Sequence, residues 1–289
     1  MDYLSGMSIA DDWQLIAHGS KKKDAAELER IHPRLKISHS EYQAIIRTYE
    51  TSLLPTSYSG AEKTILIDHY EHPPTKLNKL IQARRNDHEL DCCPYCGYPY
   101  APDTLDHFIP KDQWPEFSFL PNNLVPQCRG CAPIKGSNYY CTDNNTCLYV
   151  HPIFSDLISR ISIHVSINFD DKKTPHFNAT FSITNATPPE LDRATLHLQK
   201  IKVKSRVENY CSIEFSRLKR HLKKRNFDIR DLLKATIEKK MELDGRALDW
   251  QCALYQAIYH NHASITYLHS FRKNNNPPPQ TLIETTINI

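Results

Sequence analysis

Glycine and long apolar runs are scarce in this 289-residue chain, which has 7 glycines against 19 prolines. So little glycine argues against glycine-rich nucleotide folds, whose phosphate-binding loops need several of them. No apolar run approaches the roughly 20 residues that span a membrane. The start, Met1-Asp2-Tyr3-Leu4, has neither the basic nor the apolar region of a secretory signal. We therefore expect an intracellular, cytoplasmic protein with no membrane association.

Charge is distributed unevenly although the formal net charge is only +3. Residues 92–150 carry three Lys/Arg and five Asp/Glu, whereas 196–240 carry 14 Lys/Arg and 5 Asp/Glu. A mildly acidic centre beside a strongly basic segment is typical of a metal-dependent enzyme that acts on a polyanion. The densest basic run, Arg217 to Arg225, has two interpretations: a nucleic-acid contact or a solvated helix face.

The pattern of apolar residues predicts helices before the cysteine-rich centre. Ser38-x-x-Glu41 is a capping-box sequence followed by residues at helical spacing, so we expect a helix from there to near Pro55. Pro73-Pro74-Thr75 predicts the start of a second helix. We assign 1–85 to a helical N-terminal arm.

After residue 150 the pattern changes to strands and then returns to helices. Apolar residues alternate over 161–167 and again over 177–181, which predicts a hairpin with its turn at 170–173. Pro188-Pro189 opens a helical region, with two further helices expected at about 206–241 and 245–271. The C-terminal region 151–289 is therefore a hairpin plus helices, and the whole chain is expected to be α+β.

Four of the nine cysteines form two Cys-x-x-Cys pairs, Cys93/Cys96 and Cys128/Cys131. Each pair can turn both thiolates toward one ion, and two pairs supply the tetrahedral sulfur set that zinc prefers. A thioredoxin-like redox site needs only one such pair. We therefore predict a structural Zn²⁺, which is coordinatively closed and stabilises a small domain at 86–150. Five cysteines are left over: Cys92, Cys141, Cys147, Cys211 and Cys252. Cys92 is close enough to compete for the metal, but we interpret it as spare.

The segment between the two cysteine pairs carries the residues that could take part in catalysis. It reads Leu105-Asp106-His107-Phe108-Ile109-Pro110 and then Asn122-Asn123-Leu124-Val125-Pro126. Cys-x-x-Cys, Asp-His-x-x-Pro, Asn-Leu-Val-Pro and Cys-x-x-Cys-x-x-x-Lys follow one another in the order found in the HNH endonucleases. Over Cys93 to Lys135 the chain resembles this ββα-metal nuclease family.

The resemblance implies a zinc-stapled ββα-metal HNH domain and a role for each matching residue. His107 would be the general base that activates water, and Asp106 would be a ligand of a catalytic Mg²⁺ or Mn²⁺. Asn123 would hold the loop that presents the histidine, and Lys135 could contact phosphate. The function expected from it is metal-dependent cleavage of nucleic acid, with double-stranded DNA favoured.

One position departs from the family pattern. The family places Asn or His directly after the last cysteine as a second ligand of the catalytic cation, and this chain has Ala132, whose methyl group cannot coordinate. Three explanations remain open. The chain is an inactivated form of a parent with Asn or His there, a variant that borrows a ligand such as Asn138, or a non-catalytic member. The first is our working hypothesis.

Two other functions compete with DNA cleavage. A ribonuclease effector acting on tRNA would use the same active site, and a zinc-ribbon-like binding module would cut nothing. More loosely, the long regions flanking the centre resemble the HNH effector of Septu-type antiphage systems. That likeness implies an antiviral role and an ABC-type ATPase as protein partner.

Overall fold

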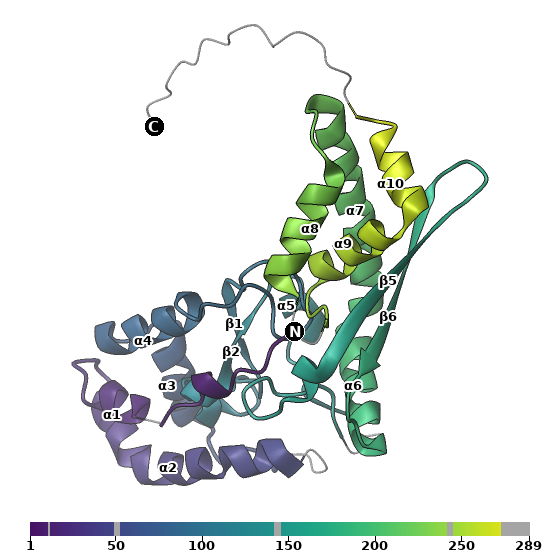
Figure 1. Cartoon of the computed structure of the whole chain (residues 1–289). Helices are drawn as coiled ribbons and strands as arrows, with labels where there is room; N and C mark the ends of the chain where they lie inside the picture. The colour runs from purple at the N-terminus through teal and green to yellow at the C-terminus, as the bar shows by residue number, and fades with distance from the viewer. Residues whose placement is uncertain (11, 49–52, 142–145, 242–244, 273–289) are drawn as a thin grey trace, which may run out of the picture.

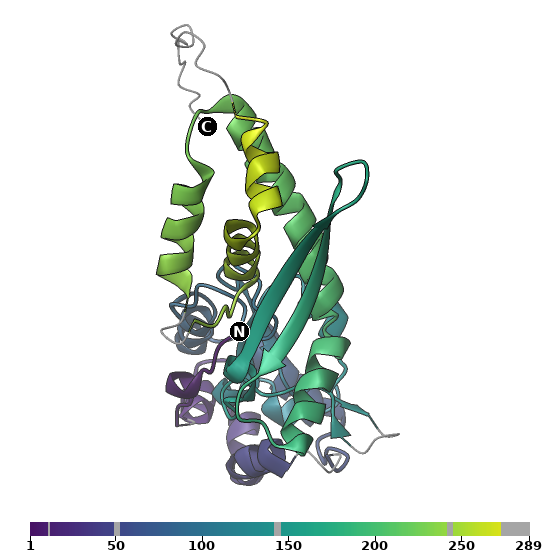
Figure 2. The same cartoon turned by 45° about the vertical axis from the view of Figure 1, so that its right-hand side comes forward.

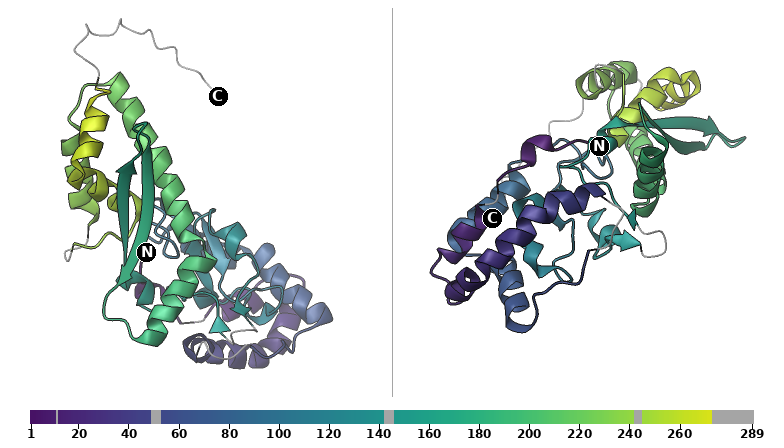
Figure 3. Two further views of the ribbon diagram at one scale, coloured as in Figure 1. Left: turned by 90° about the vertical axis from the view of Figure 1, so that its right-hand side faces the viewer. Right: turned by 90° about the horizontal axis from the view of Figure 1, so that it is seen from below.

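The computed structural model describes residues 1–10, 12–48, 53–141, 146–241 and 245–272, and they form a mixed helix-and-strand structure (Figure 1). Most elements are helices, and the strands pair in three two-stranded antiparallel sheets. Figures 1 and 3 show the N-terminal helices at one end and the C-terminal helices with their hairpin at the other. The short central strands lie between them. The α+β class is confirmed.

The N-terminal region is helical, but its longest helix begins earlier than predicted. The elements are η1 (Ser5–Met7), α1 (Trp13–His18), α2 (Ala25–Thr48), α3 (Gly60–Glu71) and α4 (Thr75–Asn86). Helix α2 runs through Pro33 and through Ser38, where the sequence predicted a start. Leu28, Leu35 and Tyr42 form one buried stripe, so packing overrides the capping sequence. Helix α4 begins at Thr75, as predicted.

The central region is a strand pair followed by a one-turn helix. Its elements are β1 (Thr104–His107), η2 (Pro115–Phe117), η3 (Pro121–Asn123), β2 (Leu124–Gln127), α5 (Ala132–Lys135), β3 (Tyr140–Cys141) and β4 (Thr146–Cys147). Strand β1 pairs antiparallel with β2, so that Asp106 lies opposite Val125 and His107 opposite Leu124. This pairing brings the Asp-His sequence and the second cysteine pair to opposite ends of one small sheet.

The predicted hairpin is present in the C-terminal region. Its elements are η4 (Leu157–Arg160), β5 (Ile161–Phe169), β6 (Pro175–Ile183), α6 (Pro188–Lys200), α7 (Val203–Lys224), α8 (Ile229–Lys240), α9 (Trp250–His260) and α10 (His262–His269). The hairpin runs alongside α7 (Figure 2). A Thr187–Glu190 capping box starts α6.

Each of the two long C-terminal helices predicted from sequence is divided in two. The first is interrupted before Asp228, whose side chain accepts the backbone N–H of Arg230 and starts α8. The second begins only at Trp250 and changes direction at Asn261, which caps α10. The spacing of apolar residues predicted two continuous helices, and capping side chains divide each of them.

Two hydrophobic clusters form the core and meet at the central strands. The larger includes the four paired cysteines, Phe108 and Val125 together with the C-terminal elements. The smaller joins helices α1 to α4 to Phe119 and Leu124. Neighbouring residues of β2 therefore pack into different clusters, which fixes the sheet between both ends of the molecule. None of the described helices is long and apolar enough to cross a membrane.

Candidate metal centre and the adjoining Asp106–His107 site

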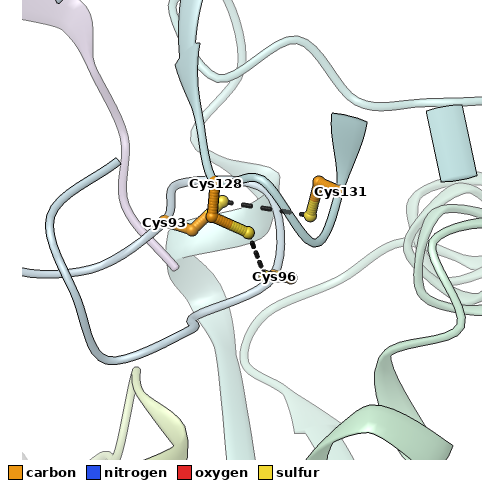
Figure 4. A group of neighbouring side chains, drawn as sticks. All are labelled: Cys93, Cys96, Cys128 and Cys131. Atoms are coloured by element: carbon orange, nitrogen blue, oxygen red, sulfur yellow. Dashed lines mark hydrogen bonds between the residues drawn. The ribbon is translucent and has the colours of Figure 1, made fainter. Parts of the chain in front are cut away.

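The four paired cysteines converge into one buried group (Figure 4). The sulfurs of Cys93 and Cys131 lie 4.0 Å apart and those of Cys96 and Cys128 lie 3.8 Å apart. All four sulfurs lie within 4.8 Å of one another. Four Zn–S bonds of about 2.3 Å at tetrahedral angles require sulfurs about 3.8 Å apart. The cluster thus has the geometry to hold a structural metal such as zinc.

Local backbone geometry explains how each pair forms a turn. The N–H of Gly97 donates to the carbonyl of Cys93 at 2.8 Å, and the N–H of Cys131 donates to the carbonyl of Cys128 at 2.9 Å. Gly97 has φ +74°, and a Cβ there would lie 2.6 Å from the Leu248 carbonyl oxygen. Glycine is therefore required on both conformational and steric grounds.

Arg206 of α7 covers the sulfur cluster. Its guanidinium lies 3.3 Å from Cys131 Sγ, 3.6 Å from Cys128 Sγ and 3.7 Å from Cys96 Sγ. The same group lies 5.2 Å from the centre of the Trp250 ring. Four thiolates around a divalent ion carry a net charge of −2, so a cation that donates to their sulfurs stabilises the site.

Asp106 lies in the interior with both carboxylate oxygens engaged. Lys135 Nζ is 3.1 Å from Oδ1, and the Tyr95 hydroxyl donates to Oδ2 at 2.8 Å. Burial, followed by the nearby Asp106 charge, holds the pKa of Tyr95 well above its usual range, so the hydroxyl keeps its proton. The carboxylate of Asp106 is thus fixed from two sides.

Lys135 is fully buried, which differs from its predicted contact with phosphate. Besides Asp106, its ammonium donates to the carbonyls of His107 and Phe108, at 3.0 and 3.1 Å. Three acceptors match its three N–H groups. The one-turn helix α5 directs this side chain inward across β1, so its role is internal.

His107 is partly buried and held in one tautomer. Its Nε2 lies 2.8 Å from the carbonyl oxygen of Ser118, which can only accept, so Nε2 carries the proton. The lone pair is therefore on Nδ1. The Tyr70 ring of α3 packs edge-on against the imidazole, with centroids 4.3 Å apart. Burial lowers the pKa of His107 to about 3, so the ring is neutral at neutral pH.

Asn123 joins the two ends of the loop between β1 and β2. Its Oδ1 accepts the N–H of Ile109 at 2.8 Å, and its amide nitrogen donates to the carbonyls of Ile109 and Phe117. The Tyr42 hydroxyl of α2 also donates to Oδ1, at 2.8 Å. The asparagine is fully buried, so all these bonds are shielded from water.

Ala132 lies on the same helical face as Lys135, because residues three apart on a helix are neighbours. Residue 132 thus offers a methyl group on the helical face that carries Lys135. Asn138 is exposed beyond the end of α5. In the part of the chain that the structure describes, the sulfur cluster is the sole group of three or more potential metal ligands. The donors around Asp106 fall short of a resident Mg²⁺ or Mn²⁺ site.

The sequence analysis did not predict three residues that contact these sites. Tyr95 lies inside the first cysteine pair and supports Asp106, Tyr70 comes from a helix that was not predicted, and Arg206 lies in α7. Only Arg206 had a signal, because it belongs to the basic segment that starts near residue 196. The other two are defined by tertiary packing alone.

Comparisons with known proteins are sparse. No family model matches the chain, and no solved structure matches it. A 51-residue segment is 51% identical to protein ea31 of Escherichia phage lambda. The match covers 18% of this chain and 17% of that phage protein. The chain is similar to the phage protein over this short segment.

Proposed function

We propose that this chain has the framework of an HNH (ββα-metal) endonuclease that acts on nucleic acid, with double-stranded DNA as the favoured substrate. Strand β1, strand β2 and helix α5 follow one another between and after the two cysteine pairs, in the order expected of that family. A structural zinc would hold the framework together, and Asp106 and His107 lie at its centre.

The observation that carries the proposal is the orientation of His107. A general base needs a neutral nitrogen with a free lone pair, fixed in direction. The Ser118 carbonyl binds Nε2–H and leaves Nδ1 as the acceptor. Asn123 ties the loop that follows this histidine to its own return strand. A surface Asp-His pair without a function has no need of such support.

The proposed centre has too few protein ligands for a catalytic cation. A hard divalent ion such as Mg²⁺ would neutralise charge on the phosphate when bound. Asp106 is the carboxylate that the resemblance assigns to this ion, and it already accepts from Lys135 and Tyr95. Because Ala132 adds no ligand, we propose that the chain binds nucleic acid and that efficient cleavage requires Asn or His at this position.

The test is a comparison of this chain with its Ala132→Asn variant on supercoiled plasmid, single strands and total RNA, with Mg²⁺ or Mn²⁺. We expect the variant to cleave orders of magnitude faster, and His107→Ala in the variant background to abolish cleavage while zinc content is retained. Equal cleavage by the two chains would show that the ligand assignment is wrong. The substrate that is cut distinguishes DNA from RNA.

A second candidate is a module that binds nucleic acid and does not cut it. The buried Asp106–Lys135 ion pair favours this function, because it satisfies the carboxylate without any external ion. In that case the Ala132→Asn chain remains inactive with every substrate and metal, while binding to nucleic acid persists.

A further inference from the structure

A hollow lies between the cysteine pairs and helix α7, at the other end of β1 from His107. Its volume is about 680 Å³, within the range of small-ligand sites. Residues from both turns, from α7 and from α9 line it: Tyr98, Tyr100, Cys128, Arg129, Tyr210 and Trp250. None of these residues belongs to the Asp106–His107 centre.

Four aromatic rings form one side of the hollow. The centre of the Tyr98 ring lies 5.2 Å from that of Tyr100, 6.3 Å from that of Tyr210 and 5.2 Å from that of Trp250. Trp250 and Tyr210 are 5.8 Å apart. The Tyr100 ring is half exposed although it joins this group. A partly open aromatic group provides a surface on which another flat ring can stack.

Arginines surround the rings on the side of α7 and the second cysteine turn. Arg129 is largely exposed and bonds to Asp103, 2.7 Å away, while Arg217 lies 3.4 Å from a carboxylate oxygen of Glu214. Arg206 also lines the hollow. Arg206 is engaged with the sulfur cluster, whereas Arg129 and Arg217 are 80% and 48% exposed, so their guanidinium groups remain accessible to a phosphate.

We propose that this hollow binds a nucleobase of an unpaired nucleic-acid strand, stacked on Tyr100, with the adjoining phosphates near Arg129 and Arg217. Stacking requires a base whose face is free, and the faces of paired bases are covered by their neighbours. This inference rests on the proposed function to the extent that nucleic acid is the ligand.

The position of the hollow matches this role. Asp103 at its edge precedes His107 by four residues of extended chain, a separation of about 13 Å. A strand that passes His107 can therefore reach the hollow without leaving the central region. The basic residues of α7 continue from the hollow toward Arg225 and extend the attraction for a polyanion.

The test measures binding of a labelled 20-nucleotide single strand and of the matching duplex by fluorescence anisotropy, with the zinc-loaded full chain. Tyr100→Ala is expected to weaken single-strand binding about 5- to 100-fold, in line with the loss of one stacked base. Duplex binding should change less than 2-fold. Tyr100→Phe keeps the ring and should bind like the parent chain, as should Tyr3→Ala at an exposed tyrosine outside the hollow.

Three results would overturn the inference. These are unchanged single-strand affinity in Tyr100→Ala, an equal loss in Tyr3→Ala, and competition by free mononucleotides but not by strands. The outcome is separable from that of the proposed nuclease. If Ala132→Asn cuts duplex DNA but Tyr100→Ala binds single strands normally, only the hollow is misassigned. If the stacking effect is found and no variant cuts, the binding module is the better function.

Discussion

The ammonium of Lys135 lies 3.1 Å from Oδ1 of Asp106, and neither side chain is exposed beyond 8%. An internal cation thus holds the carboxylate to which the HNH resemblance assigns a divalent ion. Removal of one member from such a pair leaves an uncompensated charge in the interior, which costs more than the pair itself contributes.

Lys135→Met is accordingly expected to lower the free energy of unfolding by about 3–5 kcal/mol. The double variant Asp106→Asn, Lys135→Met should lose less, because no unpaired charge remains. Urea unfolding of the zinc-loaded chains measures both. Lys234→Met removes an exposed lysine whose partner Glu238 is also exposed, so its effect should stay below about 0.5 kcal/mol. A double variant less stable than the single one would contradict this account.

Loss of the metal should unfold the central region, because this small domain depends on its sulfur cluster. Cys96→Ser is expected to abolish stoichiometric zinc, measured by atomic emission, and to reduce the circular dichroism of the folded chain. Cys252→Ser changes an equally buried cysteine outside the cluster and should retain one zinc per chain. Full zinc content in Cys96→Ser would rule out the four-sulfur site.

Arg206→Met tests the contacts between α7 and the sulfurs. Loss of a group that donates to metal ligands commonly lowers metal affinity 10- to 100-fold, so zinc transfer to a chromophoric chelator should accelerate about 10-fold or more. Arg217→Met lies on the same helix without contact to the cysteines and is the matched control. Identical transfer rates in the two variants would mean that the N–H···S contacts do not stabilise the site.

Stability should fall as the pH decreases below about 6.5. Burial lowers the pKa of His197 to about 4, and its ring bonds to the Val150 N–H and the Tyr95 carbonyl. Above pH 6.5 the ring is neutral in both states. Below it, the unfolded chain takes up a proton that the folded chain refuses, so this group lowers the free energy of unfolding by up to about 1.4 kcal/mol per pH unit until about pH 4.

His197→Gln is the variant that isolates this effect. A glutamine amide can accept from Val150 and donate to Tyr95 but does not titrate. The change in unfolding free energy between pH 7.5 and 5.5, measured in excess zinc, should be smaller than in the parent by about 1 kcal/mol. Parallel pH profiles for the two chains would show that His197 does not contribute.

The sequence predicted those features that depend on local spacing. The cysteine pairs need only one short turn each, and the hairpin shows its period of two directly, so both were placed correctly. Helix α2 was misplaced because a capping sequence at Ser38 lies inside a longer buried stripe.

The contacts that hold Asp106 and His107 in place could not be predicted from the sequence. The contact between Lys135 and Asp106 depends on how a one-turn helix packs across a strand, whereas the sequence analysis expected Lys135 to contact phosphate. Tyr70 reaches His107 from a helix 37 residues earlier in the chain. Such contacts carry no periodic or motif signal, because they are set by the packing of whole elements.

The residues that cover the sulfur cluster, Arg206 and Trp250, are synthesised long after its four cysteines. The indole N–H of Trp250 donates to the carbonyl of Cys96, 154 residues earlier, and Arg206 contacts three of the four sulfurs. On the ribosome, all four thiols emerge before α7 and α9 exist. The four thiols can therefore meet before the contacts from Arg206 and Trp250 exist, and those contacts form only when translation has passed residue 250.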